Sequence, residues 1–302
     1  MIRIATRKSK LALWQASWVK AQLEALGESA SLVEIETQGD KDMRSFAHIQ
    51  GVGFFTKAVQ EAILDGRADM AVHSFKDLPS APHPELEIAA MSSREDPRDV
   101  LILHPDCWRG EQEHIDDYAD KGLEQLKEAA HIGTSAVRRQ RQLAALRPDL
   151  RLSDCRGNVP SRLAKLAKGD YDGIVLAAAG IKRLELDLGD WVLLYMHSEL
   201  LLPAPAQGVL ALECHRSNYQ LAQRLTDLND MPSYKLVAAE RGLMAMLQGG
   251  CQLALGAHAS HEEDGSIALS AWYEGRKVRS RHRSSEGAAM LAYQELGYPA
   301  HS

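Results

Sequence analysis

The chain has 302 residues, of which 45% are hydrophobic and 25% are charged, and its formal net charge at pH 7 is −6. These values are ordinary for a soluble globular protein, and the length favours two or three domains. No apolar run approaches the roughly 18 residues of a membrane span, which excludes that class. The first residues lack the apolar core of a signal peptide, so we expect a cytoplasmic protein that binds no membrane.

The first elements alternate between strands and helices. Apolar periodicity predicts a strand at 2–5, a helix through 11–23, a strand at 32–37 and a helix at 54–64. The polar stretch between the last two, about fifteen residues with three glycines, is typical of a lid or binding loop.

The stretch 69–82 reads as a buried strand that ends in a polar loop. Met70, Ala71 and Val72 are apolar, and Asp77 follows them just before Pro79. Ligands of α/β sheets bind beyond the carboxyl ends of strands, and Arg7 follows the first strand in the same way. Asp77 is therefore a candidate catalytic residue. The alternative is a solvated turn acid beside Lys76.

Further strands are predicted at 86–90 and 100–103, and the charged segment 92–99 between them is a candidate domain crossover. Residues 105–122 are acidic and irregular, which favours a surface insertion.

From 131 onward strands and helices alternate again. Three strand ends then present Thr134 and Ser135 with Arg138 and Arg139, Arg156 with Asn158, and the turn 178–183. Because parallel strands end at one sheet edge, we expect these arginines to converge.

Charge is unevenly distributed along the chain. Residues 131–183 carry eight arginines and three lysines against four aspartates, a net charge of +7 that leaves −13 for the remainder. Guanidinium grips carboxylate or phosphate through paired N–H donors, so an anionic ligand is expected. The alternative is salt bridges on helix faces, which we expect for Arg141, Arg147 and Arg151. A nucleic-acid partner is disfavoured, since the basic segment lies in an acidic protein without clustered aromatic residues.

A second crossover is predicted at 203–208, followed by a strand at 209–212 that returns to the first lobe. The fold class is therefore α/β, with two hinged lobes like those of periplasmic binding proteins and a small α+β C-terminal domain. Its elements are a helix at 235–247, a hairpin through 263–265 and a helix at 286–296. The predicted domains are 1–95 with 203–226, 96–202, and 227–302.

The four cysteines are widely spaced and contain no Cys-x-x-Cys pair, which argues against a zinc site and a disulfide framework. The twelve histidines show no ligand spacing, so no metal is expected. Cys251 follows Gly249 and Gly250. It is either a small buried hydrophobe or a thiolate that carries a covalent group into a cleft, and spacing alone leaves both open.

Taken together, several segments resemble the porphobilinogen deaminase (hydroxymethylbilane synthase) family, in family order along nearly the whole chain. They are Ile4-Ala5-Thr6-Arg7-Lys8-Ser9 with Leu11-Ala12-Leu13-Trp14-Gln15, Ala71-Val72-His73-Ser74-Phe75-Lys76-Asp77-Leu78-Pro79, Arg94-Glu95-Asp96-Pro97-Arg98-Asp99, Gly133-Thr134-Ser135 with Arg138-Arg139-Gln140, Arg156-Gly157-Asn158-Val159, Gln207-Gly208, and Gly249-Gly250-Cys251-Gln252. Each segment is weak evidence alone, and their combination is very specific.

The resemblance implies a monomeric three-domain transferase of tetrapyrrole synthesis. Such an enzyme joins four porphobilinogen molecules head to tail with loss of ammonia and then releases hydroxymethylbilane. By resemblance, Asp77 is the catalytic acid, and Cys251 holds one dipyrromethane cofactor through a thioether. The residues implied in cofactor binding are Lys76, Ser74, Thr134, Ser135, Arg138, Arg139, Arg156 and Asn158. Those implied in substrate binding are Arg7, Ser9, Arg162, Arg183, Phe55 and Gln15.

The chain departs from the family pattern in the stretch before the helix at 54–64. Val52 and His48 stand where the family usually has lysines, which puts in doubt how this loop grips carboxylates. A divergent paralogue is therefore one alternative. The other is a non-catalytic binding module for a small dicarboxylate, which would leave Cys251 and the third domain without a role.

Overall fold

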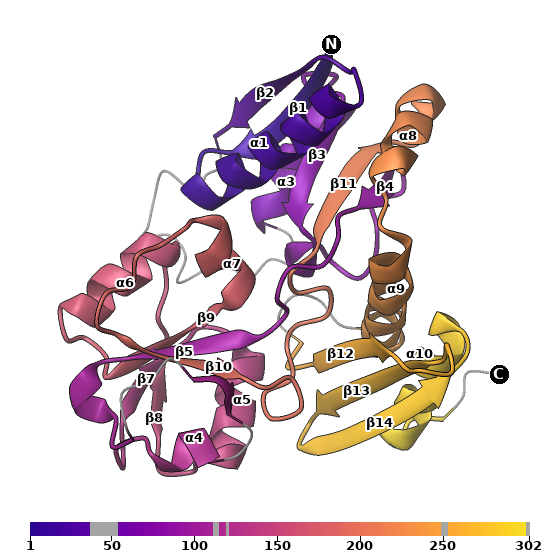
Figure 1. Ribbon diagram of the computed structural model, residues 1–302. Coiled ribbons are helices and arrows are strands. Elements are labelled where there is room, and N and C mark those ends of the chain that lie inside the picture. Colours follow the sequence, from indigo (N-terminus) through magenta and orange to yellow (C-terminus); the bar gives the residue numbers. More distant parts are fainter. Residues whose placement is uncertain (37–53, 111–114, 119–120, 249–252, 300–302) are drawn as a thin grey trace. The chain divides into compact units, whose positions relative to one another are not determined.

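The computed structural model describes residues 1–36, 54–110, 115–118, 121–248 and 253–299. The chain forms two compact units (Figure 1). Unit 1 comprises Met1–Glu95, Gly208–Lys235 and Gln248–Cys251, and unit 2 comprises Asp96–Gln207, Leu236–Leu247 and Gln252–Ser302. Of the described helices, none combines the length and the apolar character that crossing a membrane requires.

Unit 1 is built on a five-stranded sheet with the order β2-β1-β3-β11-β4. The strands are β1 (Ile2–Arg7), β2 (Ala30–Ile35), β3 (Met70–Ser74), β4 (Leu86–Met91) and β11 (Leu210–His215). β1 is parallel to both neighbours, whereas β11 is antiparallel to β3 and β4. The strand after the second crossover therefore lies between two strands of the first lobe, which confirms the predicted return.

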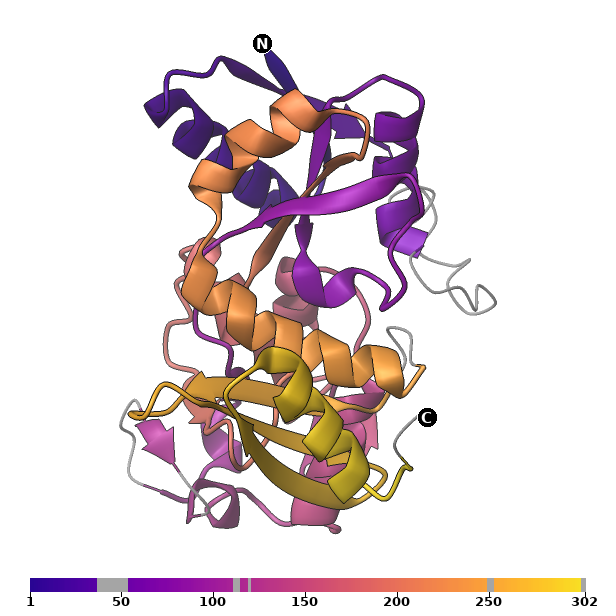
Figure 2. The same cartoon turned by 90° about the vertical axis from the view of Figure 1, so that its right-hand side faces the viewer.

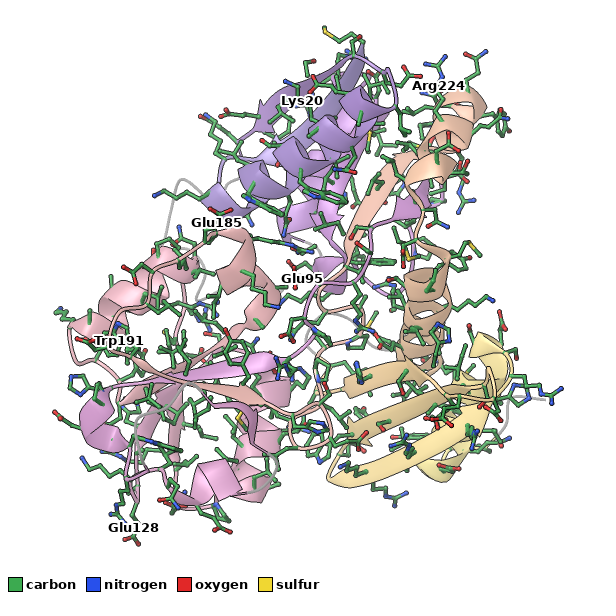
Figure 3. The ribbon with its side chains drawn as sticks, viewed as in Figure 1. Lys20, Glu95, Glu128, Glu185, Trp191 and Arg224 are labelled. Atoms are coloured by element: carbon green, nitrogen blue, oxygen red, sulfur yellow. The ribbon has the colours of Figure 1, made fainter. Side chains whose placement is uncertain are left out.

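Helices cover both faces of this sheet. α1 (Lys10–Ala25) lies on one face and α3 (Phe54–Leu64) on the other (Figure 1). Side chains alternate along a strand, so Ile4 of β1 packs with the α1 side and its neighbour Ala5 with the α3 side. α8 (Tyr219–Leu225) follows β11, and Figure 3 labels Arg224 on it and Lys20 on α1.

Unit 2 contains a six-stranded sheet with the order β6-β10-β5-β9-β7-β8. Its strands are β5 (Asp99–Leu103), β6 (Ile115–Tyr118), β7 (His131–Gly133), β8 (Arg151–Ser153), β9 (Gly173–Ala177) and β10 (Val192–Met196). β7 is parallel to β8 and β9, as predicted, and β5 is antiparallel to β9 and β10. Both faces of β5 are buried, which explains its continuous apolar run.

The prediction of an irregular segment at 105–122 is wrong in part. The segment contains β6, which pairs with β10 at the edge of the sheet, and the first residues of α4 (Lys121–Glu124). The acidic sequence of β6 has little strand propensity of its own, so pairing with a neighbouring strand determines its conformation.

The other helices of unit 2's α/β part are α5 (Val137–Leu146), α6 (Val159–Ala167) and α7 (Ala178–Arg183). The C-terminal part has a three-stranded antiparallel sheet formed by β12 (Gly256–His261), β13 (Ile267–Tyr273) and β14 (Arg276–His282). α10 (Ser285–Glu295) packs on this sheet, and α9 (Met231–Met246) precedes it (Figure 2). The predicted hairpin and closing helix are confirmed. β14 was not predicted, because charged residues fill most of its positions.

The two crossover segments between the units are hydrogen-bonded to one another at two places, once within each unit. In unit 1 the Glu95 N–H donates to the Gly208 carbonyl at 3.2 Å. In unit 2 the Gln207 side-chain amide donates to the Pro97 carbonyl at 2.7 Å and to Asp99 Oδ1 at 2.8 Å. The structure thus confirms an α/β fold with two sheet–helix lobes and a small C-terminal sheet domain. The exact limits of the three domains stay a prediction.

Candidate active site

Unit 1 contains a pocket at the carboxyl ends of β1 and β3. Its polar wall residues are Arg7, Ser9, Gln15, Thr56, His73, Ser74 and Asp77. Arg7 is the last residue of β1, and Ser9 caps α1 because its Oγ accepts a hydrogen bond from the Ala12 N–H at 3.3 Å. The cap turns the chain from strand to helix directly at the pocket.

Asp77 reaches this pocket through a tight turn. β3 ends at Ser74, and a single 3₁₀ turn, Phe75–Asp77, follows. The Phe75 N–H donates to the Val209 carbonyl at 3.0 Å, and the Leu78 N–H donates to the Phe75 carbonyl at 3.2 Å. Phe75 and Leu78 are buried, whereas Asp77 between them is exposed at the pocket. Two apolar anchors therefore hold the carboxyl group in place.

The structure brings five of the sequence-predicted site residues together in unit 1. They are Arg7, Ser9, Gln15, Ser74 and Asp77. Gln15 is 3% exposed, and its amide donates to Ser74 Oγ at 2.8 Å, which joins α1 to the end of β3. Lys76 belongs to the same turn as Asp77.

In unit 2, Arg138 and Arg139 are buried around Asp99. Arg138 Nη1 lies 2.8 Å from Asp99 Oδ2, and Arg139 Nη2 lies 2.7 Å from Asp99 Oδ1. Burial acts to raise the pKa of Asp99, but the two guanidinium charges and the hydrogen bonds from Arg139 and Gln207 hold it well below its usual range. Arg138 also donates to the Leu202 carbonyl at 2.5 Å. Both arginines at the start of α5 thus have protein partners.

The loop before α5 presents hydroxyl groups. The Thr134 side chain accepts a hydrogen bond from the Ala136 N–H at 3.4 Å, and the Thr134 carbonyl accepts one from Gln140 at 2.7 Å. Ser135 Oγ is buried and has no hydrogen-bond partner among the described residues. A buried hydroxyl of this kind suits an oxygen atom of a bound ligand.

The remaining predicted residues of unit 2 lie around α6 and α7. Arg156 pairs with Asp154 at 2.7 Å, and both side chains are largely exposed. Asn158 caps α6, because its Oδ1 accepts from the Ser161 N–H at 2.9 Å. Arg162 donates to the Gly157 carbonyl at 2.8 Å. Arg183 is the buried last residue of α7.

The strand ends of unit 2 share one edge, as predicted, but their arginines have different partners. Arg138 and Arg139 contact Asp99, whereas Arg156 contacts Asp154. The expected convergence on one ligand therefore stays a prediction. The expected salt bridge of Arg147 is confirmed, with Asp149 at 2.7 Å.

Some predicted features fall outside the described residues. They are Cys251, the predicted lid or binding loop that contains His48 and Val52, and the side chain of Phe55, which belongs to the first turn of α3. In the part of the chain that the structure describes, no group of three or more His, Cys, Asp or Glu residues could hold a metal ion.

Sequence reasoning missed three polar residues near these sites. Asp99 opens an apolar strand, and Glu213 is the single acid within β11. His73 appeared only as a member of a motif, yet it lines the pocket and contacts Glu213. A lone acid inside an otherwise apolar strand was the available signal, because buried charges require partners.

The fold and the pocket define an α/β protein whose first sheet carries a pocket lined by an arginine and an exposed carboxyl group. Comparison with known proteins narrows this class. Residues 2–223 match "Porphobilinogen deaminase, dipyromethane cofactor binding domain", and residues 234–279 match "Porphobilinogen deaminase, C-terminal domain". The chain belongs to the porphobilinogen deaminase family.

Curated relatives agree over most of their length. The chain is 45% identical to a porphobilinogen deaminase of Syntrophotalea carbinolica over 265 residues, 87% of this chain and 79% of the relative. It is 43% identical to one of Xylella fastidiosa over 268 residues, 88% of this chain and 83% of the relative. Among solved structures, a periplasmic arginine-binding protein of Salmonella typhimurium is 10% identical with a TM-score of 0.43, covering 77% of this chain and 93% of its own.

Family membership assigns the reaction class. The chain is a transferase with hydroxymethylbilane synthase activity in tetrapyrrole synthesis, and its cofactor is dipyrromethane.

Proposed function

We propose that the pocket of unit 1 is where porphobilinogen is activated, with Asp77 as the proton donor. The observation that carries this proposal is the position of Asp77, exposed at a pocket that Arg7 and Ser9 also line. The carboxyl group of Asp77 and the candidate anion-binding residues Arg7 and Ser9 thus line the same pocket.

Loss of ammonia from the aminomethyl group requires a proton at the leaving nitrogen and produces a cationic azafulvene. Asp77 in its acid form donates that proton. The resulting carboxylate then stabilises the cation electrostatically. When the new bond forms, the ring that attacks the azafulvene loses the proton on its α-carbon. This proton returns Asp77 to its acid form, so each addition uses and regenerates one proton.

The acetate and propionate groups of the substrate need cationic and hydroxyl partners. Arg7, Ser9 and Gln15 offer donor groups from the walls of the pocket, and Gln15 also donates to Ser74 Oγ. On the family resemblance, we also propose Phe55, Arg162 and Arg183 as substrate-binding residues. The growing product carries two carboxylates per ring, and unpaired they would repel one another strongly.

The cofactor assignment concerns residues of both units. Lys76 and Ser74 of unit 1 and Thr134, Ser135, Arg138, Arg139, Arg156 and Asn158 of unit 2 would hold its carboxylates. The buried Ser135 hydroxyl, which has no partner in the described part of the chain, fits such a group. When bound, the dipyrromethane supplies the free α-position at which chain growth starts.

We assign the thioether to Cys251. The three described cysteines, Cys107, Cys155 and Cys214, are all buried. Burial raises the pKa of each thiol, to about 11 for Cys107 and Cys214, with nearby carboxylates adding to the effect. Since the thiolate is the reactive form, these three are poor attachment points, which supports Cys251.

Intact mass spectrometry tests this assignment. The wild-type protein should exceed its sequence mass by two linked pyrrole units, and Cys251→Ser should not. Cys155→Ser, which changes a buried thiol, is the matched control and should keep the added mass. An unmodified wild-type mass after incubation with porphobilinogen would instead support a binding module for a small dicarboxylate.

We further propose that the protein is a cytoplasmic monomer that binds neither nucleic acid nor membrane. Its net negative charge supports the exclusion of nucleic acid. Size-exclusion chromatography with light scattering should give the mass of one chain, and a mass of two chains would contradict this proposal.

A further inference from the structure

A buried glutamine of unit 2 holds the backbone of one residue at two points. Gln142 lies on α5 and is 2% exposed. Its side-chain amide donates to the Leu202 carbonyl at 3.0 Å, and its Oε1 accepts from the Leu202 N–H at 2.9 Å. Two hydrogen bonds to one residue fix both the position and the orientation of its backbone. Leu202 therefore cannot shift against α5 without breaking this pair.

The same carbonyl also contacts the arginine pair. Arg138 donates to the Leu202 carbonyl at 2.5 Å and lies 2.8 Å from Asp99. Arg138 and Gln142 are four positions apart on α5, so their side chains lie on the same face of the helix. The backbone of Leu202 is thus attached to the arginine-bearing start of α5.

Strand β12 begins against this attached backbone. The Ala257 N–H donates to the Pro203 carbonyl at 2.9 Å. At Gly256, the first residue of β12, a Cβ atom would lie 2.7 Å from Leu202 Cβ and 2.8 Å from Gln142 Nε2. A glycine here permits a close approach that a side chain would prevent. β12 therefore packs directly on the backbone that Gln142 holds.

This arrangement connects the two parts of the cofactor site proposed above. Arg138 and Arg139 lie at the start of α5, and Cys251, the proposed attachment point, shortly precedes β12 in the sequence. We propose that Gln142 is a positioning residue of the cofactor site, which keeps the two arginines and the strand after Cys251 at a fixed separation. It acts through the Leu202 backbone rather than by contact with the cofactor.

This inference rests on the proposed roles of Arg138, Arg139 and Cys251, and its discriminating variant is Gln142→Met. Methionine is a flexible side chain of similar length that forms no amide hydrogen bonds, so α5 still packs while the Leu202 backbone is released. We expect the cofactor-free variant, produced in cells without porphobilinogen, to fold. Its rate of cofactor uptake on incubation with porphobilinogen, followed by intact mass, should fall at least about fivefold, the equivalent of one hydrogen bond of about 1 kcal/mol.

A second readout separates positioning from structural support. Contacts that a cofactor makes only with the folded state stabilise that state, so the loaded protein should melt at a higher temperature than the cofactor-free protein. We call this increase the cofactor shift. It should shrink in Gln142→Met, whereas loss of a residue that only supports packing would lower both melting temperatures equally. A wild-type cofactor shift in Gln142→Met would overturn the proposal.

Ser280→Ala is the matched control in the same unit. Ser280 is 2% exposed, and its Oγ donates to the Ala288 carbonyl at 2.7 Å, which joins β14 to α10 rather than to α5. Both melting temperatures of this variant should fall by the same amount, and its uptake rate should be that of the wild type. A loss of the cofactor shift as large as that of Gln142→Met would show that any weakening of unit 2 has this effect, which contradicts the proposal.

Gly256→Ala tests the same connection from the side of β12. Its methyl group would displace β12 from Leu202, so the cofactor shift should shrink although every side chain of α5 is unchanged. When Gly256→Ala is combined with Gln142→Met, the loss of the cofactor shift should be smaller than the sum of the two single losses, because both changes break one connection. Additive losses would indicate two independent effects and contradict the proposal.

Failure of this inference is separable from failure of the cofactor assignment. If Cys251→Ser kept the added mass, the attachment point would lie elsewhere and the role of Gln142 would fall with it. If Cys251→Ser lost the added mass while Gln142→Met kept the wild-type cofactor shift, only the inference about Gln142 would be wrong.

Discussion

At the scale of single residues, the trio of Asp99, Arg138 and Arg139 has a structural role that is compatible with the binding role proposed for its arginines. Its ion pairs are almost completely buried, and two guanidinium groups share one carboxylate. The net charge of the trio is therefore +1. A residual positive charge in a buried place can attract one carboxylate of a ligand without leaving either arginine unpaired beforehand.

In the proposed mechanism, the proton chemistry of the site depends on one residue, Asp77. Asp77→Asn keeps the shape of the side chain and removes its ability to donate and recover a proton. We expect a folded protein with the normal cofactor mass whose rate of ammonia release falls by a factor of about 10² to 10⁴, the usual contribution of general acid–base catalysis. Single-turnover ammonia release measures this rate, and a rate near the wild-type value would remove Asp77 from the acid role.

The pairing of the arginines marks the limit of what the sequence could predict about the site. The arginine-rich segment and the strand ends were visible in the sequence. Asp99, however, lies about forty residues before Arg139, and only the antiparallel pairing of β5 with β9 brings the two segments together. Contacts across a sheet depend on strand order, which a single sequence does not determine.

At the scale of elements, the predictions succeeded where periodicity was strong. The limits of α3 agree with the predicted helix, and β5 and β9 follow their apolar runs. They failed at β6 and β14, two edge strands rich in charged residues. An edge strand needs only one neighbour, and charges on it prevent pairing between molecules, so its sequence has little strand character.

The second crossover depends on a glycine. Gly208 has a φ of +93°, and a Cβ there would lie 2.2 Å from the Glu95 carbonyl oxygen. Gly208→Ala should therefore break the hydrogen bond between the crossover strands and destabilise unit 1 by more than about 1 kcal/mol. Faster hydrogen exchange at the Glu95 amide would report this change.

Gly265→Ala is the control, since Gly265 also has a positive φ, +77°, but open space around its Cβ. It shares the cost of the backbone conformation without the clash. An effect of Gly208→Ala no larger than that of Gly265→Ala would show that the crossover tolerates the close approach.

At the scale of the whole molecule, the buried trio makes stability depend on pH. The folded-state pKa of Asp99 lies below its ordinary value of 3.8, because the charges of Arg138 and Arg139 outweigh the effect of burial. A depressed carboxyl pKa contributes stability that is fully present above the unfolded-state value. This contribution is lost as the pH falls through about 4 towards the folded-state value.

Asp99→Asn isolates this contribution, because the variant leaves two buried guanidinium groups without a counter-charge. At pH 7 it should lower the free energy of unfolding by about 3 to 5 kcal/mol, as expected when one partner of a buried ion pair is removed. The difference from the wild type should shrink as the pH falls below about 4, since Asp99 then binds a proton in the unfolded wild-type chain but not in the folded protein, which lowers wild-type stability. Urea unfolding measures this difference in the free energy of unfolding, and hydrogen exchange of the β5 and α5 amides reports it for unit 2.

Asp154→Asn is the control. It removes an exposed partner of Arg156 and should lower the free energy of unfolding by less than about 1 kcal/mol at pH 7. A difference between Asp99→Asn and wild type that stayed constant from pH 7 to pH 3 would show that the charge of Asp99 does not stabilise unit 2.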